Sequence, residues 1–314
     1  MRFWKPIRFI PDGTKIAFMR VSRFGFFVSG ILCAASILLF AFMGLNYGVD
    51  FKGGTVITIR TEGPANLDRL RSTLGDLGLG DIELQEFGGP RDVLIRLEAQ
   101  DGGEEAEQAA VAKVKAALGT GVEYRSVEVV GPKVSEELTQ EAILAVVLSI
   151  GAVLIYLWFR FEWQFAVGGV ISLLHDVLLS IGLFCIIGLE FNLNIIAAIL
   201  TIIGYSLNDT VVVFDRIREF LRKYKSMALA DLIDFSINSV LPRTMLTSVS
   251  TMIALISLYV FGGEVIRGFT FAMIWGVVVG TYSSIFIASP VLILLGTERE
   301  NVKAEARAAV AARP

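Results

Sequence analysis

The 314-residue sequence has few of the residue types that build metal centres, disulfide frameworks and catalytic triads. It contains 2 cysteines and 1 histidine. Cys33 and Cys185 both lie in apolar stretches and neither belongs to a CxxC pair, which excludes a disulfide framework and a cysteine metal site. Because His175 is the only histidine, a histidine-rich metal centre is excluded as well. We predict no metal site and no cofactor.

Charge and catalytic motifs are also scarce. Charged residues make up 19% of the chain and the net charge is −3, so nothing indicates a nucleic-acid partner. The sequence has no GxxxxGK phosphate loop, no HExxH and no GxSxG. We therefore predict that the protein is not an enzyme. One enzymatic alternative stays open at this point, an intramembrane protease in which Asp176 and Asp209 form a carboxylate dyad.

Apolar residues are abundant, at 54% of the chain. Six apolar stretches are long enough to cross a hydrocarbon core of about 30 Å as helices. They predict an α-helical integral membrane protein with spans at 24–45, 142–159, 165–189, 192–214, 244–262 and 268–295. The first span has a long leading segment and no cleavage pattern after it, so we interpret it as a retained signal anchor.

Lys and Arg in the short flanks of the spans predict the orientation. They concentrate in three segments, which are 1–23, 215–243 and 296–314. We therefore predict that these three segments, and with them both termini, are cytoplasmic. The long segment 46–141 then lies on the opposite, extracytoplasmic side.

The 46–141 segment has the patterns of a small α+β domain. Alternating β-branched and apolar residues predict strands, and leucine or valine at helical spacing predicts two amphipathic helices. In chain order the elements are predicted at 54–60, 66–79, 81–87, 91–97, 104–118 and 122–130. This βαββαβ order is that of a ferredoxin-like split unit.

Ionisable residues at membrane depth are the main candidates for function. His175 and Asp176 fall near the centre of the third span, Asp209 lies in the fourth, and Arg243 opens the fifth after Pro242. A charge at the bilayer centre costs about 2.5–3.5 kcal/mol on insertion scales, so such groups usually face the helix bundle and mark ion or proton paths. Structural alternatives stay open. Asp209 and Arg243 could form a static buried pair, or Arg243 could only mark the cytoplasmic edge. Asp176 could be a structural acid hydrogen-bonded to a neighbouring helix, and His175 could have a packing role.

A proton relay is the hypothesis that these residues favour. Apolar surroundings favour the protonated form of a carboxyl, whereas a nearby guanidinium favours the ionised form. If Arg243 is close to Asp209 in one conformation and distant in another, the carboxyl binds and releases a proton in turn. Thr247 and Thr251 belong to a hydroxyl stripe of the fifth span that predicts a hydrated path, and Asn208 is a secondary candidate.

Three stretches of the chain resemble the SecD/SecF family of protein-export membrane proteins, in the RND permease superfamily. The first is Gly48-Val-Asp-Phe-Lys-Gly-Gly-Thr55, with Gly48, Asp50, Phe51, Gly53 and Gly54 as its characteristic residues. The others are Leu174-His-Asp-Val177 and the long motif that starts at Ile203 and contains Asn208-Asp209-Thr210. Phe51, where the SecD branch has leucine, favours the SecF branch of the family.

The resemblance implies half of an RND-type bundle in the bacterial inner membrane. It implies a heterodimer with SecD, beside the SecYEG channel and its associated components, that uses the proton-motive force to promote late translocation of preproteins. It also assigns the proton-conducting roles to Asp209 and Arg243. Two alternatives stay open, a proton-coupled efflux permease half and a passive scaffold, as does Na⁺ in place of H⁺. Small-residue faces at 44–48 and 276–280 are available for the partner contact.

Overall fold

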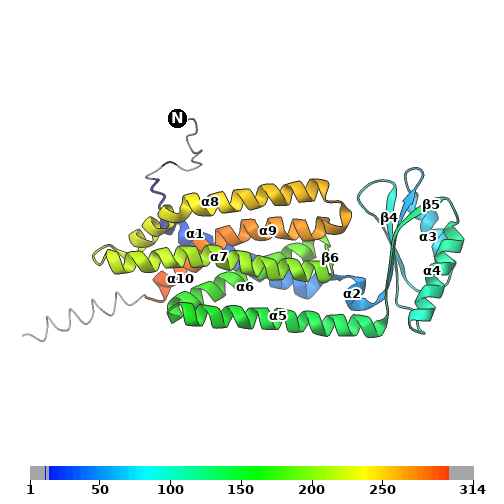
Figure 1. Ribbon diagram of the computed structural model, residues 1–314, viewed down its shortest axis with the longest axis horizontal. Helices are drawn as coiled ribbons and strands as arrows, with labels where there is room; N and C mark the ends of the chain where they lie inside the picture. Colours follow the sequence, from blue (N-terminus) through cyan, green and yellow to red (C-terminus); the bar gives the residue numbers. More distant parts are fainter. Residues whose placement is uncertain (1–10, 12–13, 297–314) are drawn as a thin grey trace, which may run out of the picture.

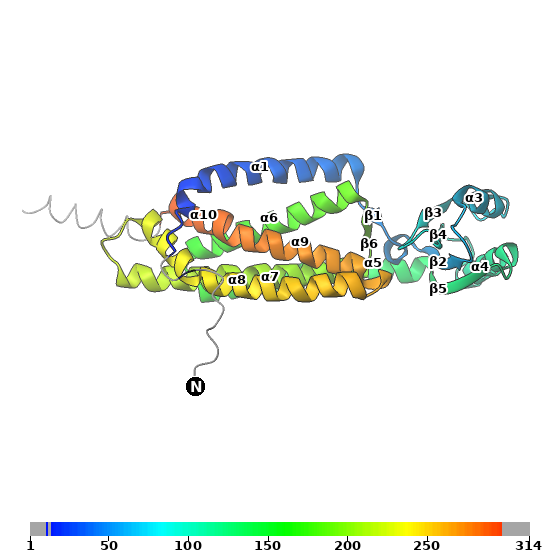
Figure 2. The ribbon, with the colours of Figure 1, turned by 90° about the horizontal axis from the view of Figure 1, so that it is seen from above.

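The computed structural model describes residues 11 and 14–296 of the chain. Six helices in this part are long and apolar enough to cross a membrane. They run side by side and form an elongated bundle (Figures 1 and 2). Their bounds are α1 Phe18–Met43, α5 Pro132–Arg160, α6 Trp163–Ile187, α7 Leu193–Lys223, α8 Leu229–Phe261, and α9 Arg267–Ser283 with its continuation. The continuation of α9 is a π-helical turn, Ser284–Ala288, followed by α10, Ser289–Leu294. The prediction of an α-helical membrane protein with six spans is confirmed.

The helices extend further into the polar segments than their apolar residues indicate. The segment 215–243, predicted as a cytoplasmic loop between two spans, is mostly helical, because α7 continues to Lys223 and α8 already starts at Leu229. At the other end of the bundle, α5 starts at Pro132, ten residues before the predicted span at 142. Hydropathy marks only the part of a helix that lies in the hydrocarbon, whereas the backbone hydrogen bonds of a helix continue into water. The predicted tail at 296–314 lies, apart from Gly296, outside the described residues.

A four-stranded antiparallel sheet follows the first membrane helix. Its strands are β2 Gly54–Thr61, β3 Ile82–Glu86, β4 Asp92–Leu97 and β5 Val122–Val130, in the order β3-β4-β2-β5. Helices α3 Leu67–Gly75 and α4 Glu104–Leu118 cover the face that points away from the bundle (Figure 1). Ile57, Ile95 and Val114 are fully buried between this face and the helices. The element order is the predicted βαββαβ, while the ferredoxin-like assignment stays a prediction.

Helices α7 and α9 approach each other closely at the centre of the bundle. A Cβ atom on Gly276 would overlap the side chain of Ile202, and one on Gly280 would lie 3.0 Å from the Cβ of Ser206. Both glycines are buried within this chain. The expectation that the 276–280 face is available to a partner is therefore wrong. Small residues at these two positions instead let two helices of the same chain pack at short range.

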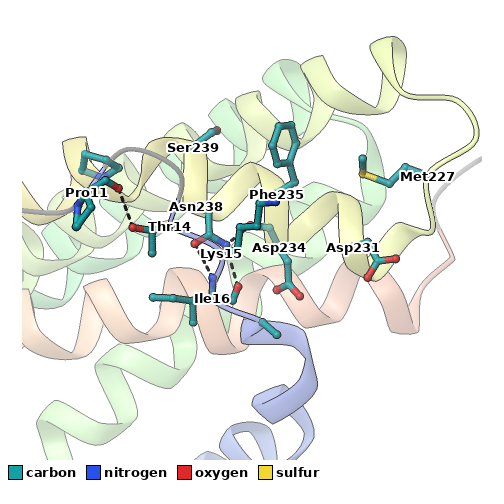
Figure 3. A pocket seen from close by; sticks show the side chains of 12 residues that line it. Pro11, Thr14, Lys15, Ile16, Met227, Asp231, Asp234, Phe235, Asn238 and Ser239 are labelled. Atoms are coloured by element: carbon teal, nitrogen blue, oxygen red, sulfur yellow. Dashed lines mark hydrogen bonds between the residues drawn. The ribbon is translucent and has the colours of Figure 1, made fainter.

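The segment that precedes α1 lies beside α8, where its side chains and those of α8 line a pocket (Figure 3). The side-chain amide of Asn238 on α8 exchanges two hydrogen bonds with the backbone of Ile16, at 3.0 and 2.8 Å. Asp234 accepts a hydrogen bond of 2.9 Å from the Met19 N–H. Because Ala17 provides no side-chain cap of its own, Asp234 satisfies an orphan donor at the start of α1. These contacts fix α1 to α8 beside a pocket of about 530 Å³.

Candidate functional site

Asp209 lies on α7 and faces the interior of the bundle, with 2% of its surface exposed. Its one hydrogen bond in the described part of the chain is long, at 3.5 Å from the Thr281 hydroxyl of α9. The same hydroxyl lies 2.8 Å from the Val277 carbonyl and 2.9 Å from the Ser248 hydroxyl of α8. A hydroxyl has a single proton to donate, so Thr281 cannot serve all of these oxygens at once. The carboxyl is therefore buried without a full set of donors.

Arg243 lies on α8 next to this cluster but is exposed. Its charge acts on Asp209 from a distance, and no ion pair joins the two side chains in the part of the chain that the structure describes. A static buried ion pair is thus not the arrangement of this conformation.

The other predicted site residues near Asp209 are exposed or half-buried, and in the described structure they form no hydrogen bond with its carboxyl. Asn208 is exposed on α7, and Thr251 is half-buried on α8. Thr247 donates its hydroxyl proton to the Thr244 carbonyl, 2.8 Å away within the same helix. The predicted hydroxyl stripe therefore reaches a neighbouring helix mainly through Ser248, which contacts Thr281.

A second polar cluster is buried where α6, α7 and α9 meet. Asp176 on α6 is 1% exposed and accepts hydrogen bonds from Ser206 of α7 and from Ser283 of α9, the latter at 2.8 Å. Its other oxygen lies 2.9 Å from Nδ1 of His175, which is 4% exposed. Spacing along one helix predicted that His175 and Asp176 lie at membrane depth, whereas the two serine partners come from other helices and were missed. In this structure, Asp176 and Asp209 have separate hydrogen-bond partners.

The Gly48–Gly54 motif connects the sheet domain to the start of α7. Asp50 lies in a short helix, α2 Val49–Lys52, and its Oδ2 accepts a hydrogen bond of 2.9 Å from the Leu193 N–H. Negative charge at a helix N-terminus is stabilising, since it complements the helix dipole and satisfies an orphan N–H. Phe51 packs against Phe191, with ring centroids 5.9 Å apart. The motif thus holds the N-terminal end of the helix that carries Asp209.

Close backbone approach explains two of the glycines in this motif. A Cβ on Gly48 would lie 2.8 Å from the Glu190 carboxyl, and Gly54 adopts φ +111°, a conformation that side chains disfavour. Gly48 lies next to a two-residue parallel pair between β1 Asn46–Tyr47 and β6 Glu190–Phe191. Glycine at position 48 therefore lets the chain leaving α1 pack directly against the α6–α7 connection.

An ion pair joins the sheet to the same connection. Arg96 on β4 lies 2.8 Å from Glu190 and 3.0 Å from Glu83, and its side chain is 12% exposed. Burial raises the pKa of Glu190, and the Arg96 guanidinium opposes that rise. The sheet domain is therefore attached to the membrane helices by a backbone pair, a helix cap and an ion pair, all within one junction.

Comparison with known proteins identifies this arrangement. Residues 110–298 match the family described as "Protein export membrane protein SecD/SecF, C-terminal", and residues 38–65 match the "SecD/SecF GG Motif". The chain is 45% identical over 313 residues to the "Protein translocase subunit SecF" of Cereibacter sphaeroides, and the match covers 96% of each chain. It is 44% identical over 299 residues to the "Protein translocase subunit SecDF" of Brucella abortus, which covers 95% of this chain and 39% of that one.

A solved structure has the same fold. The crystal structure of SecDF, a translocon-associated membrane protein from Thermus thermophilus, matches with a TM-score of 0.82 at 34% identity. The match covers 90% of this chain and 39% of the SecDF chain. This chain thus spans about two fifths of the length of the two SecDF proteins, and nearly the whole length of the SecF relative.

The chain belongs to the SecD/SecF family of protein-export membrane proteins, which confirms the resemblance carried by its motifs. It is a multi-pass membrane protein with an auxiliary role in Sec protein export. The family is a translocase accessory family and not an enzyme family, so the intramembrane protease alternative is wrong.

Proposed function

We propose that this chain acts with a SecD subunit in the bacterial inner membrane and uses the proton-motive force to promote late translocation of preproteins. In this proposal Asp209 is the proton-binding group and Arg243 is its cationic partner. The observation that carries it is the position of Asp209, a carboxyl buried between α7, α8 and α9 with one long hydrogen bond. A charge is costly in the interior of the membrane, so the free energy of this carboxyl depends strongly on whether it is protonated or ionised.

The surroundings of Asp209 offer a way to follow its charge. When the carboxyl is neutral, the Thr281 hydroxyl is free to donate to the Val277 carbonyl at 2.8 Å. When the carboxyl is ionised, it draws the Thr281 proton and attracts the exposed guanidinium of Arg243. An ion pair at membrane depth needs the two helices to change their relative rotation or tilt, because Arg243 is exposed in this conformation. Proton binding and release then alternate with helix movement.

Movement of α7 reaches the sheet domain through the Asp50 cap. From residue 193 to residue 209, α7 spans about 24 Å at a rise of about 1.5 Å per residue. Its N-terminal end is bonded to Asp50, and the adjoining connection is paired with Arg96. A rigid helix that carries the proton site at one position and the domain junction at its end transmits displacement between them. Two solved SecDF chains match this chain at TM-scores of 0.82 and 0.70 with identities of 34% and 33%, as expected if SecDF chains adopt more than one conformation.

A partner subunit completes the bundle in this proposal. Large apolar side chains are exposed along α1, α5 and α8, and these faces suit lipid or another helix bundle. The relatives in which SecD and SecF are one chain support SecD as that partner. Both termini then lie in the cytoplasm, the sheet domain lies on the outer side, and the SecYEG channel and the translocating preprotein are further partners.

The test is an Asp209→Asn variant, which keeps the size of the side chain and removes its titration. We expect the variant to assemble with its partner, as measured by co-purification, and to lose the part of preprotein translocation that depends on the proton gradient. Translocation is measured in reconstituted vesicles with and without a protonophore. The ATP-driven step in the absence of a gradient is expected to be unchanged.

Asp215→Asn is the matched control on the same helix. The side chain of Asp215 is 41% exposed and lies 2.7 Å from Arg160, so this variant loses the same charge away from the bundle interior. We expect it to retain gradient-dependent translocation. If the Asp209→Asn variant also retains it, the proton-relay proposal is refuted and the chain acts as a passive scaffold.

A further inference from the structure

The His175–Asp176 cluster is separate from the Asp209 site and has the composition of a second titrating group. Both residues are at least nine-tenths buried, and their side chains lie 2.9 Å apart. Among the described residues, Nε2 of His175 has no hydrogen-bond partner. We propose that His175 and Asp176 form a second proton-binding site in the membrane, in which Nε2 of the imidazole takes up the proton.

The hydrogen bonds of Asp176 suit its ionised form. Oδ2 of Asp176 accepts the hydroxyl protons of Ser206 and Ser283. An ionised carboxylate only accepts, so in this form Nδ1 of the imidazole carries the proton in its bond to Oδ1. Nε2 then holds the free lone pair. Proton uptake forms one N–H bond at Nε2, breaks no other bond, and leaves an imidazolium paired with a carboxylate.

Charge balance favours this uptake. The neutral imidazole and the ionised Asp176 together carry one negative charge, which is costly in an apolar interior, whereas the protonated pair is neutral overall. Helices α1, α5, α7, α9 and α10 and the π-helical turn pack against α6. At membrane depth their titratable groups are all acids, namely Cys33, Tyr156, Tyr205, Asp209 and Tyr282. With no lysine or arginine among them, a proton is the charge that balances Asp176.

The His175–Asp176 cluster forms hydrogen bonds with α7 and α9, the two helices that also carry Asp209 and Thr281. Ser206 lies one turn before Asp209 on α7, and Ser283 lies two residues after Thr281 on α9. Directly after Ser283 the helix contains the π-helical turn Ser284–Ala288, and π-turns of this kind are frequent at functional sites. A positive charge on the His175 imidazole competes with the two serine hydroxyls for the Asp176 carboxylate. The protonation state of the pair therefore acts on the α7–α9 contact.

The function of this site in export depends on the proposed function above, while its proton binding does not. The test uses His175 as the single histidine of the chain. The full chain is labelled with ¹⁵N-histidine, purified without a histidine tag and placed in lipid nanodiscs. Its imidazole then gives one pair of ¹⁵N signals. We expect the Nε2 signal to change from unprotonated to protonated as the pH is lowered from about 8 to about 5.

Two variants distinguish a coupled site from a lone imidazole. Asp176→Asn removes the negative charge, so the transition is expected to move to lower pH by about 1 unit or more. The Ser206→Ala, Ser283→Ala double variant removes two donors that stabilise the ionised carboxylate, so the transition is expected to move to higher pH. Ser172→Ala, one turn before Asp176 with no hydrogen-bond partner for its hydroxyl in the described residues, is the control and is expected to leave it unchanged.

An Nε2 signal that stays constant over this pH range overturns the proposal, as does a transition that Asp176→Asn leaves in place. The outcome is independent of the export assay. The transition is expected to persist in Asp209→Asn protein, so failure of the Asp209 relay and failure of the His175–Asp176 site give different results.

Discussion

Removal of the Asp50 carboxyl tests whether the Gly48–Gly54 motif holds the start of α7. Asp50→Ala deletes the acceptor of the Leu193 N–H, a hydrogen bond of 2.9 Å. Loss of an N-terminal capping side chain costs about 0.5–2 kcal/mol. A change of about 1 kcal/mol raises the population of an opened first turn about fivefold. Asn192 stays in place as the cap of the Ile195 N–H, so the rest of the helix is expected to remain folded.

Asp50→Asn separates the hydrogen bond from the charge. The amide oxygen keeps an acceptor for the Leu193 N–H, and only the charge–dipole interaction is lost, worth about 0.3–1 kcal/mol. We therefore expect graded opening, with wild type slowest, Asp50→Asn intermediate and Asp50→Ala fastest. The measurement is hydrogen–deuterium exchange of a peptide covering residues 190–199, in nanodiscs.

Asp76→Ala is the control, because Asp76 is an exposed acid in the same domain and forms no hydrogen bond through its side chain in the described structure. It is expected to leave exchange at 190–199 unchanged. Unchanged exchange in Asp50→Ala would refute the capping role of Asp50. Equal exchange in the Asn and Ala variants would show that charge, and not the hydrogen bond, is the main contribution.

Two further variants test packing and pH dependence. Gly276→Val forces the side chain into Ile202 and is expected to destabilise the α7–α9 contact by about 1–3 kcal/mol in thermal unfolding; Gly151→Ala, which meets no neighbour, is its neutral control. The Arg60 guanidinium hydrogen-bonds Asp92 and lowers the pKa of that carboxyl below 3.8. The Arg60–Asp92 pair therefore stabilises the sheet above pH 3.8, and this stabilisation is lost as the pH falls through the lowered pKa of Asp92. We expect proteolysis to become faster over this pH range in wild type but not in Asp92→Asn.

The membrane helices and the sheet domain were predictable because their signals are local. An apolar run long enough to span the bilayer is visible within one segment, and the 54–60 strand shows its alternation over a few residues. Helix ends were less predictable. The polar segment 215–243 marks where the hydrophobic spans end, but α7 and α8 continue through most of it.

The sites depend on contacts between distant parts of the chain. Asp50 bonds a backbone group 143 residues away, and Asp176 bonds Ser283 across 107 residues. No pattern of period 2 or 3.6 carries this information. The sequence also placed Asp209 and Arg243 at similar depth, but the rotation of each helix about its axis is decided by packing, and it leaves one buried and the other exposed.

The sequence alone was enough to predict that this is a membrane protein with six spans. It also predicted the order of elements in the sheet domain and the family that the motifs define. The free energy of transferring apolar side chains from water is a property of each segment by itself, so these features need no partner. Only the tertiary structure decided which polar groups meet inside the bundle. Hydrogen bonds at membrane depth are short-ranged and directional, and they form only where close helix packing brings side chains from separate segments within about 3 Å.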